Sequence, residues 1–142
     1  MSGAISMVVF ESAGVDFVVP SARVSAVMEA GRIHPVPRAR KGVVGFFVHG
    51  DRLIPVVEIA PGSLKAMTAV ILVGFPDPVA VPSTSIRGVK DIPADSISPL
   101  DEAMPWVVAN AWFDGKKVAV LSPALLNSVS SGNELAEAQP KP

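Results

Sequence analysis

The feature that most constrains this chain is the way its apolar runs are interrupted. They are short, and turn-forming residues separate them. Two pairs of runs are the clearest: residues 42–48 and 52–59 on the two sides of His49-Gly50-Asp51, and residues 106–113 and 116–121 on the two sides of Asp114-Gly115. A glycine in such a turn supplies the positive φ that a tight hairpin needs. The pattern predicts two β-hairpins.

Other short runs continue the pattern. Residues 5–10 and 15–19 predict a hairpin around Gly14, and residues 67–75 and 79–81 predict two further strands. In residues 85–92 the alternation places Ile86, Val89 and Ile92 on the more buried side of a strand. Residues 93–105, with their acids and prolines, are expected to form a loop. The sum is about nine or ten short strands, which is typical of barrels and sandwiches.

Three segments need separate treatment. Residues 21–29 are compatible with a capped helix or with a turn followed by a strand, and the local pattern leaves both open. Ser122 followed by Pro123 predicts the start of a short helix. From residue 130 the chain is mostly polar, which predicts a disordered tail over 130–142.

The spacing of Trp106 and Trp112 predicts that both lie on one face of a strand.

Composition limits the class of protein. The chain has 142 residues, a formal net charge of -1 and no cysteine, so we expect one domain without disulfides, thiolate metal sites or cysteine nucleophiles. No apolar run approaches the roughly 20 residues of a membrane helix, and the N-terminus lacks a signal-peptide pattern; we expect a soluble, cytoplasmic protein. Only 18% of the residues are charged, against about 25% in typical domains. Such a chain leaves apolar surface exposed, and this usually marks a contact.

Residues that carry catalytic or ligand-binding chemistry are sparse. The two histidines, His34 and His49, lack ligand partners at metal-binding spacing. His49 and Asp51 have the chemistry of a base and its orienting carboxylate, but a solvated turn explains them better. We therefore predict no catalytic residues, no metal site and no cofactor. A basic stretch suggests an alternative function, binding of single-stranded RNA or another anion: Arg32, His34, Arg38, Arg40 and Lys41, within the loop 32–41.

The order of the segments resembles the CheW-like family, adaptor domains of chemotaxis-type signalling. Residues 17–27 are similar to the family segment in which a strand ends, a short turn closes with Arg-Val, and another strand begins. Residues 33–37, followed by residues 42–45, are similar to its proline-containing loop and glycine-started strand. Residues 53–59 resemble its apolar-Pro-Val strand, with Glu58 in place of Asp. Residues 79–99 follow the second-lobe pattern, and residues 106–126 the final hairpin and helix.

The resemblance implies an all-β fold of two SH3-like, five-stranded barrels with a short C-terminal helix. The domain would span residues 1–129, with lobe 1 over about 10–66 and lobe 2 over about 67–129, and end strands open to sharing between the lobes. It also favours a strand for residues 25–29.

The resemblance further implies a function without catalysis. Family members link the cytoplasmic tip of a methyl-accepting chemoreceptor to the regulatory domain of a CheA-type histidine kinase, in the cytoplasm at receptor arrays. Neither nucleic-acid binding nor membrane insertion is expected. Carried over by position, the partner-binding residues are Val24, Val27, His49, Gly50, Asp51, Arg52, Ala69 and Ile86. The family usually has Asn-apolar-Arg-Gly at the hairpin turn; here the turn reads Val-His-Gly-Asp, with Arg52 one position later. The chain is thus expected to be a divergent member.

Overall fold

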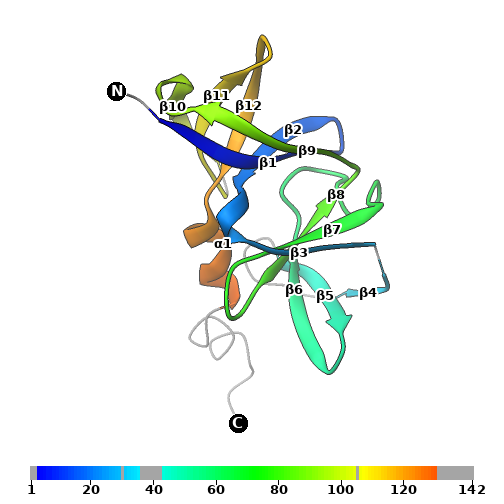
Figure 1. Cartoon of the computed structure of the whole chain (residues 1–142). Helices are drawn as coiled ribbons and strands as arrows, with labels where there is room; N and C mark the ends of the chain where they lie inside the picture. Colours follow the sequence, from blue (N-terminus) through cyan, green and yellow to red (C-terminus); the bar gives the residue numbers. More distant parts are fainter. Residues whose placement is uncertain (1–2, 30, 36–42, 105, 131–142) are drawn as a thin grey trace.

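Two β-sheets stacked one above the other, and one helix beside them, make up the fold (Figure 1). The computed structural model describes residues 3–29, 31–35, 43–104 and 106–130. The first sheet, here called the terminal sheet, has the order β10-β11-β12-β2-β1-β9. Its strands are β1 (Ala4–Ser12), β2 (Val15–Pro20), β9 (Ser85–Pro93), β10 (Ile97–Met104), β11 (Val107–Phe113) and β12 (Lys116–Leu121).

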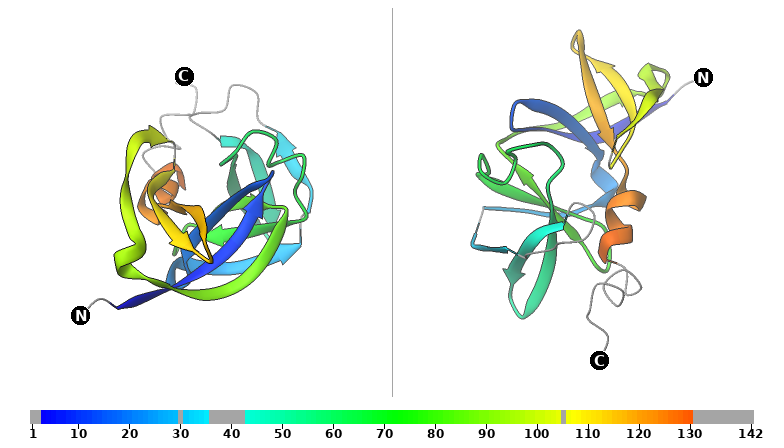
Figure 2. Two further views of the ribbon diagram at one scale, coloured as in Figure 1. Left: turned by 90° about the horizontal axis from the view of Figure 1, so that it is seen from above. Right: turned by 180° about the vertical axis from the view of Figure 1, so that it is seen from behind.

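The second sheet, here called the middle sheet, has the order β3-β7-β8-β6-β5-β4. Its strands are β3 (Val24–Glu29), β4 (Ile33–Pro35), β5 (Val43–His49), β6 (Arg52–Val57), β7 (Ala69–Val73) and β8 (Val79–Ser83). Short 3₁₀ turns, η1 (Ser21–Arg23) and η2 (Ala94–Ser96), precede β3 and β10. The helix α1 (Pro123–Ser130) packs on β6, β7 and β8 of this sheet, and Figure 2 shows it from behind.

The all-β architecture with two lobes and a C-terminal helix is confirmed, but each sheet has six strands. The division of the chain also differs from the expected boundary near residues 66 and 67. β7 and β8 pair within the middle sheet, while β1 and β2 pair within the terminal sheet. The reason is long-range pairing: β2 lies parallel to β12, with Phe17 opposite Ala119, and β1 lies antiparallel to β9. The expected tail, residues 130–142, falls almost entirely outside the described residues.

The local hairpin predictions are confirmed. Gly50, with φ 65°, joins β5 to β6, and Asp114 and Gly115, with φ 52° and 73°, join β11 to β12. Residues 24–29 form a strand, which confirms the strand that the resemblance implied for residues 25–29. The helix begins where it was expected, and the Ser122 Oγ accepts a hydrogen bond of 3.2 Å from the Leu125 amide. Residues 93–105 were expected to be a loop, which is wrong for residues 97–104, because they form β10 and pair with β11; residue 105 lies outside the described residues.

Both sheets are apolar on both faces, which explains the low charge content. In β1, Val8 and Phe10 face one core while Met7 and Val9 face another. The shared core between the sheets, here called the interlobe core, contains fourteen buried residues: Val8, Phe10, Phe17, Val19, Val57, Ala60, Ile71, Val73, Val79, Val81, Trp106, Val107, Leu121 and Leu126. The rings of Phe10 and Phe17 stack within it at 5.7 Å. Separate cores fill the terminal lobe and the middle lobe.

The two tryptophans differ in burial, and only Trp112 lies within β11. Trp106 is buried in the interlobe core, whereas Trp112 is 58% exposed. Trp106 precedes β11 and has φ 69°. In addition, the register between β11 and β12 shifts between Val107 and Ala109. This bulge interrupts the simple alternation. Beyond it, Trp112 lies opposite Lys117, on the side of Ala119, which packs against the interlobe core, so exposure distinguishes the two rings.

Candidate partner-binding surface

The interlobe core is incompletely covered along the edge strand β3. In the middle sheet, Val27 lies opposite Ile71 of β7, and Ile71 is fully buried in the interlobe core. Because residues opposite each other in a ladder lie on the same face of the sheet, Val27 faces the same side. Among the described strands none lies beyond β3, and Val27 is 49% exposed. Val24, at the start of β3, is half-buried against the same core.

The facing edge is β9, the last strand of the terminal sheet. Its Ile86 lies opposite Phe10 and its Val89 lies opposite Val8, and both partners belong to the interlobe core. Ile86 is 37% exposed and Val89 is 60% exposed. The predicted burial of these two residues is therefore wrong, because β9 is the edge of the terminal sheet and, in the described part of the chain, no further strand pairs with it there. Ile92 is fully buried, as predicted.

A β-bulge allows Ile86 and Val89 to share a face. They are three residues apart, a spacing that places side chains on opposite faces of a regular strand. The register shifts here, because Phe10 is opposite Ile86 and Val9 is opposite Gly88, so Arg87 is the extra residue. Gly88 has φ 105°. The bulge restores Val89 to the side of the interlobe core.

The connection between the lobes holds β9 in place next to β7. The Thr68 hydroxyl donates a hydrogen bond of 2.8 Å to the Thr84 carbonyl, and the Thr84 amide donates one of 2.8 Å to the Glu11 carbonyl. These bonds bring Ala69, which follows Thr68, close to the start of β9. Five residues therefore line the two edges of the interlobe core, here called the interlobe margin: Val24, Val27, Ala69, Ile86 and Val89.

The β5–β6 hairpin tip carries the remaining predicted residues. His49, Gly50, Asp51 and Arg52 are all exposed, and the His49 ring stacks on Phe47 at 6.5 Å.

Contacts of Arg52 locate the tip. Its Nη2 donates a hydrogen bond of 2.9 Å to the Pro76 carbonyl and forms an ion pair of 3.5 Å with Asp77. Residues 74–78 leave the Val73 end of β7, and Val73 lies opposite Val24. The tip is thus nearest the Val24 end of the margin. Ala69 and Ile86 lie at the other end of β7, so the structure does not bring all eight residues together.

Other predicted chemistry finds little support in the geometry. Within the described residues, no group of three or more His, Asp or Glu side chains is placed to hold a metal ion. His49 and Asp51 are exposed on the hairpin tip rather than set in a cavity. Of the basic loop, Arg32 and His34 are exposed, while Arg38, Arg40 and Lys41 lie outside the described residues. No helix in the described part of the chain is long and apolar enough to span a membrane.

Comparison with known proteins decides the family. The profile of the CheW-like domain matches residues 6–130. The chain belongs to the CheW-like family. Among solved structures, this CheW-like domain is similar to the scaffolding protein TtCheW from Thermoanaerobacter tengcongensis, with a TM-score of 0.69 and 19% sequence identity over 84% of this chain and 89% of that one. A search of curated proteins found no significant match.

One member of the margin of this CheW-like domain was missed at the sequence level. Val89 is its most exposed side chain, yet the resemblance assigned it no role. The signal is present in the sequence as Gly88, because an isolated glycine in a strand pattern suggests a bulge. A bulge at that point turns Val89 to the side of Ile86.

Proposed function

We propose that this CheW-like protein is a non-enzymatic adaptor, which joins the cytoplasmic tip of a methyl-accepting chemoreceptor to the regulatory domain of a CheA-type histidine kinase. The observation that carries the proposal is the interlobe margin. Val27, Ile86 and Val89 expose apolar surface on two facing strand edges, in a chain that belongs to a family of signalling scaffolds.

The margin suits a helical partner. Amphipathic helices dock their apolar stripe against apolar surfaces, and polar groups at the rim set the register. Here the apolar residues follow two strand edges, and polar side chains border them, among them Ser25 and Glu29 on β3. The tip of a chemoreceptor is a helical hairpin, so its apolar stripe would lie along the margin.

A second partner needs a second surface. Exposed apolar residues also occur away from the margin: Val48 and Leu53 form a cross-strand pair on the β5–β6 hairpin, and Val108 and Trp112 lie on β11. Because contiguous or aromatic apolar surface on a soluble domain usually marks a contact, these sites are the candidates for the kinase regulatory domain. The tip residues His49 to Arg52 would act at the receptor side, next to the Val24 end of the margin.

The test of the margin is charge insertion. Val27→Glu and Ile86→Glu each place a carboxylate where the receptor hairpin would bury an apolar side chain, and burying an unpaired charge is costly. We expect each change to weaken binding to a purified receptor cytoplasmic fragment by at least about tenfold, measured by co-sedimentation or calorimetry. The matched control is Val108→Glu, also an exposed valine, four strands away from β9 in the terminal sheet.

The possible outcomes of this binding experiment lead to different conclusions. Loss of receptor binding in the two margin variants, with the control unchanged and all three melting like the parent, supports the proposal. Normal receptor binding by both margin variants would show that the margin is not the docking site. Failure of the parent protein to bind either a receptor fragment or a kinase regulatory domain would refute the adaptor function itself.

A further inference from the structure

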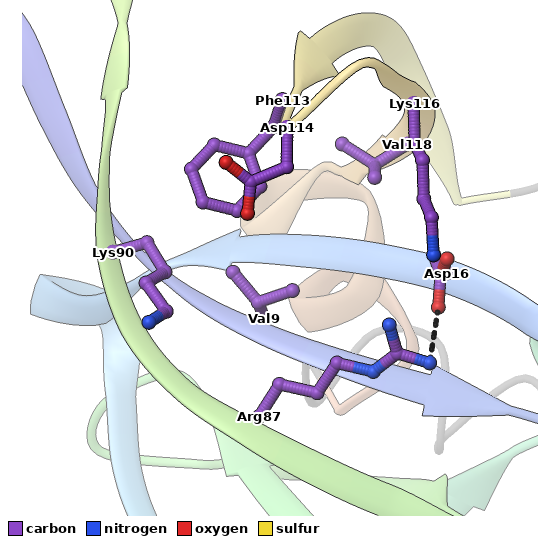
Figure 3. Close-up of a pocket in the computed structure, with 8 residues that line it drawn as sticks. All are labelled: Val9, Asp16, Arg87, Lys90, Phe113, Asp114, Lys116 and Val118. Atoms are coloured by element: carbon purple, nitrogen blue, oxygen red, sulfur yellow. Dashed lines mark ion pairs between the residues drawn. The ribbon is translucent and has the colours of Figure 1, made fainter.

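A cavity of about 240 Å³ opens at one end of the terminal lobe (Figure 3). Its floor is apolar: Val9 and Val118 are buried in the core of this lobe, and Phe113 packs against the same core. The interlobe margin lies on the other face of β1 and β9, where Val8 and Val89 point. The cavity is therefore a separate feature, with a different strand face and a different core.

The rim of the cavity carries charges of both signs. Arg87 is held by two ion pairs of 3.3 Å, to Glu11 and to Asp16, and Figure 3 shows the pair with Asp16. Three further charged side chains line the cavity and make no ion pair within the described part of the chain: Lys90, Lys116 and Asp114. Three cations and two carboxylates, Asp16 and Asp114, thus line the cavity, and charges of both signs remain available to a ligand.

The bulge in β9 directs two of these cations to the cavity. Arg87 and Lys90 are three residues apart, which in a regular strand would place them on opposite faces. Because Arg87 is the extra residue of the bulge, both line the cavity, just as Ile86 and Val89 both face the interlobe margin. Bulges commonly re-aim side chains next to binding sites.

We propose that this cavity binds a small zwitterion with an apolar side chain, of the class of free aliphatic amino acids. Lys90 and Lys116 stand on opposite sides of the cavity (Figure 3) and both attract the ligand's carboxylate, which pairs with one of them. Asp114 receives the ammonium group, and the apolar side chain lies on Val9 and Val118. A simple anion would leave the carboxylate of Asp114 without a counter-charge. A simple cation would leave both lysines without one. A zwitterion matches both signs.

The size of the cavity agrees with this class of ligand. Pockets for drug-sized molecules begin at roughly 300 Å³ and are mostly apolar with a few polar groups that fix orientation. At about 240 Å³, the cavity lies below that range, which favours a molecule of amino-acid size. The mouths of β-barrels are also common places for small-ligand sites. Because the charged groups are solvated, we expect weak binding, with a Kd on the order of 1 mM.

The test is an NMR titration of the full chain with L-leucine and three matched probes. The probe 4-methylpentanoate lacks the ammonium group, 3-methylbutan-1-amine lacks the carboxylate, and glycine lacks the apolar side chain. We expect saturable shifts of the amides of Val9, Phe113 and Val118 with L-leucine. Each matched probe should bind at least about fivefold more weakly than L-leucine.

Variants locate the site. The double change Lys90→Ala/Lys116→Ala and the single change Asp114→Asn should each weaken L-leucine binding about fivefold. Asn suits the positive φ of residue 114, so the turn is preserved. Lys117→Ala is the control, because Lys117 is also exposed on β12 but is not among the residues that line the cavity.

Three results would overturn the proposal. The first is no saturable shift with L-leucine up to about 20 mM, well above the expected Kd. The second is equally tight binding of 4-methylpentanoate or of 3-methylbutan-1-amine. The third is an equal loss of binding in Lys117→Ala, or shifts that map to the interlobe margin. None of these depends on a receptor or a kinase, so the outcome is independent of the adaptor function.

Discussion

Replacing Gly88 with alanine would perturb the backbone of β9 without removing any side-chain contact. Gly88 has φ 105°, and a Cβ built on it meets no heavy atom within 4 Å. The cost is therefore conformational rather than steric. Non-glycine residues held in such rarely occupied regions cost roughly 1–3 kcal/mol each. We expect Gly88→Ala to lower the free energy of unfolding by about 2 kcal/mol.

The strand has one way to relieve this strain, which is to lose the bulge. The register of β9 against β1 would then shift by one residue, and Arg87 would turn away from Glu11 and Asp16. Both ion pairs, 3.3 Å long and partly exposed, would break, at roughly 0.2–1 kcal/mol each. Loss of the bulge would therefore recover little free energy. It would also displace Ile86 from the margin and Arg87 from the cavity.

Urea denaturation measures the effect. With an m-value of about 2 kcal/mol per molar urea, a loss of about 2 kcal/mol lowers the midpoint by about 1 M. Gly3→Ala is the matched control, because Gly3 has no positive φ and its added Cβ also meets nothing within 4 Å; it should change stability by less than about 0.5 kcal/mol. Equal midpoints for the two variants would refute the reasoning that the bulge needs glycine.

Three further predictions concern the core and the helix. Leu126→Ala should destabilise the protein by about 2–5 kcal/mol because Leu126 is fully buried in the interlobe core, whereas Leu125→Ala, at a 45% exposed position, should have little effect in the same denaturation assay. Ser122→Ala removes the cap of α1 and should cost about 0.5–2 kcal/mol; an unchanged midpoint would argue against the cap. Acrylamide should quench the fluorescence of Trp112 much more than that of Trp106, and Trp106→Phe and Trp112→Phe assign the two signals; equal quenching would contradict the burial described here.

The sequence predicts local structure well because turn chemistry is local. The hairpins around Gly50 and around Asp114-Gly115 form where positive φ is required, and Ser122-Pro123 starts the helix. The margin residues Val24, Val27, Ala69 and Ile86 came from the family resemblance, which conveys spatial information that local pattern lacks. Their arrangement on two edges of one core follows from the sheet topology.

Long-range pairing explains most of the differences. The strand β10 contains one proline, Pro99, and two acidic residues, a composition typical of loops, and only its pairing with β11 makes it a strand. Val89 shows the same limit: strict alternation would separate it from Ile86, and the bulge against β1 returns it to the side of Ile86. No local pattern tells that β9 is an edge strand. The cavity likewise combines residues from five strands and one turn, none adjacent in the chain except Phe113 and Asp114.

The topology also has a consequence for folding during synthesis. The middle sheet uses only the continuous stretch from β3 to β8, so the ribosome supplies all its strands in succession. The terminal sheet instead joins strands from both ends of the chain, and Phe17 meets Ala119 only after about 100 further residues have been added, a closure whose entropic cost grows slowly with loop length. Until β12 emerges, β2 keeps an open, apolar edge, which is a template for aggregation. We expect nascent chains that end before residue 116 to depend most on chaperones.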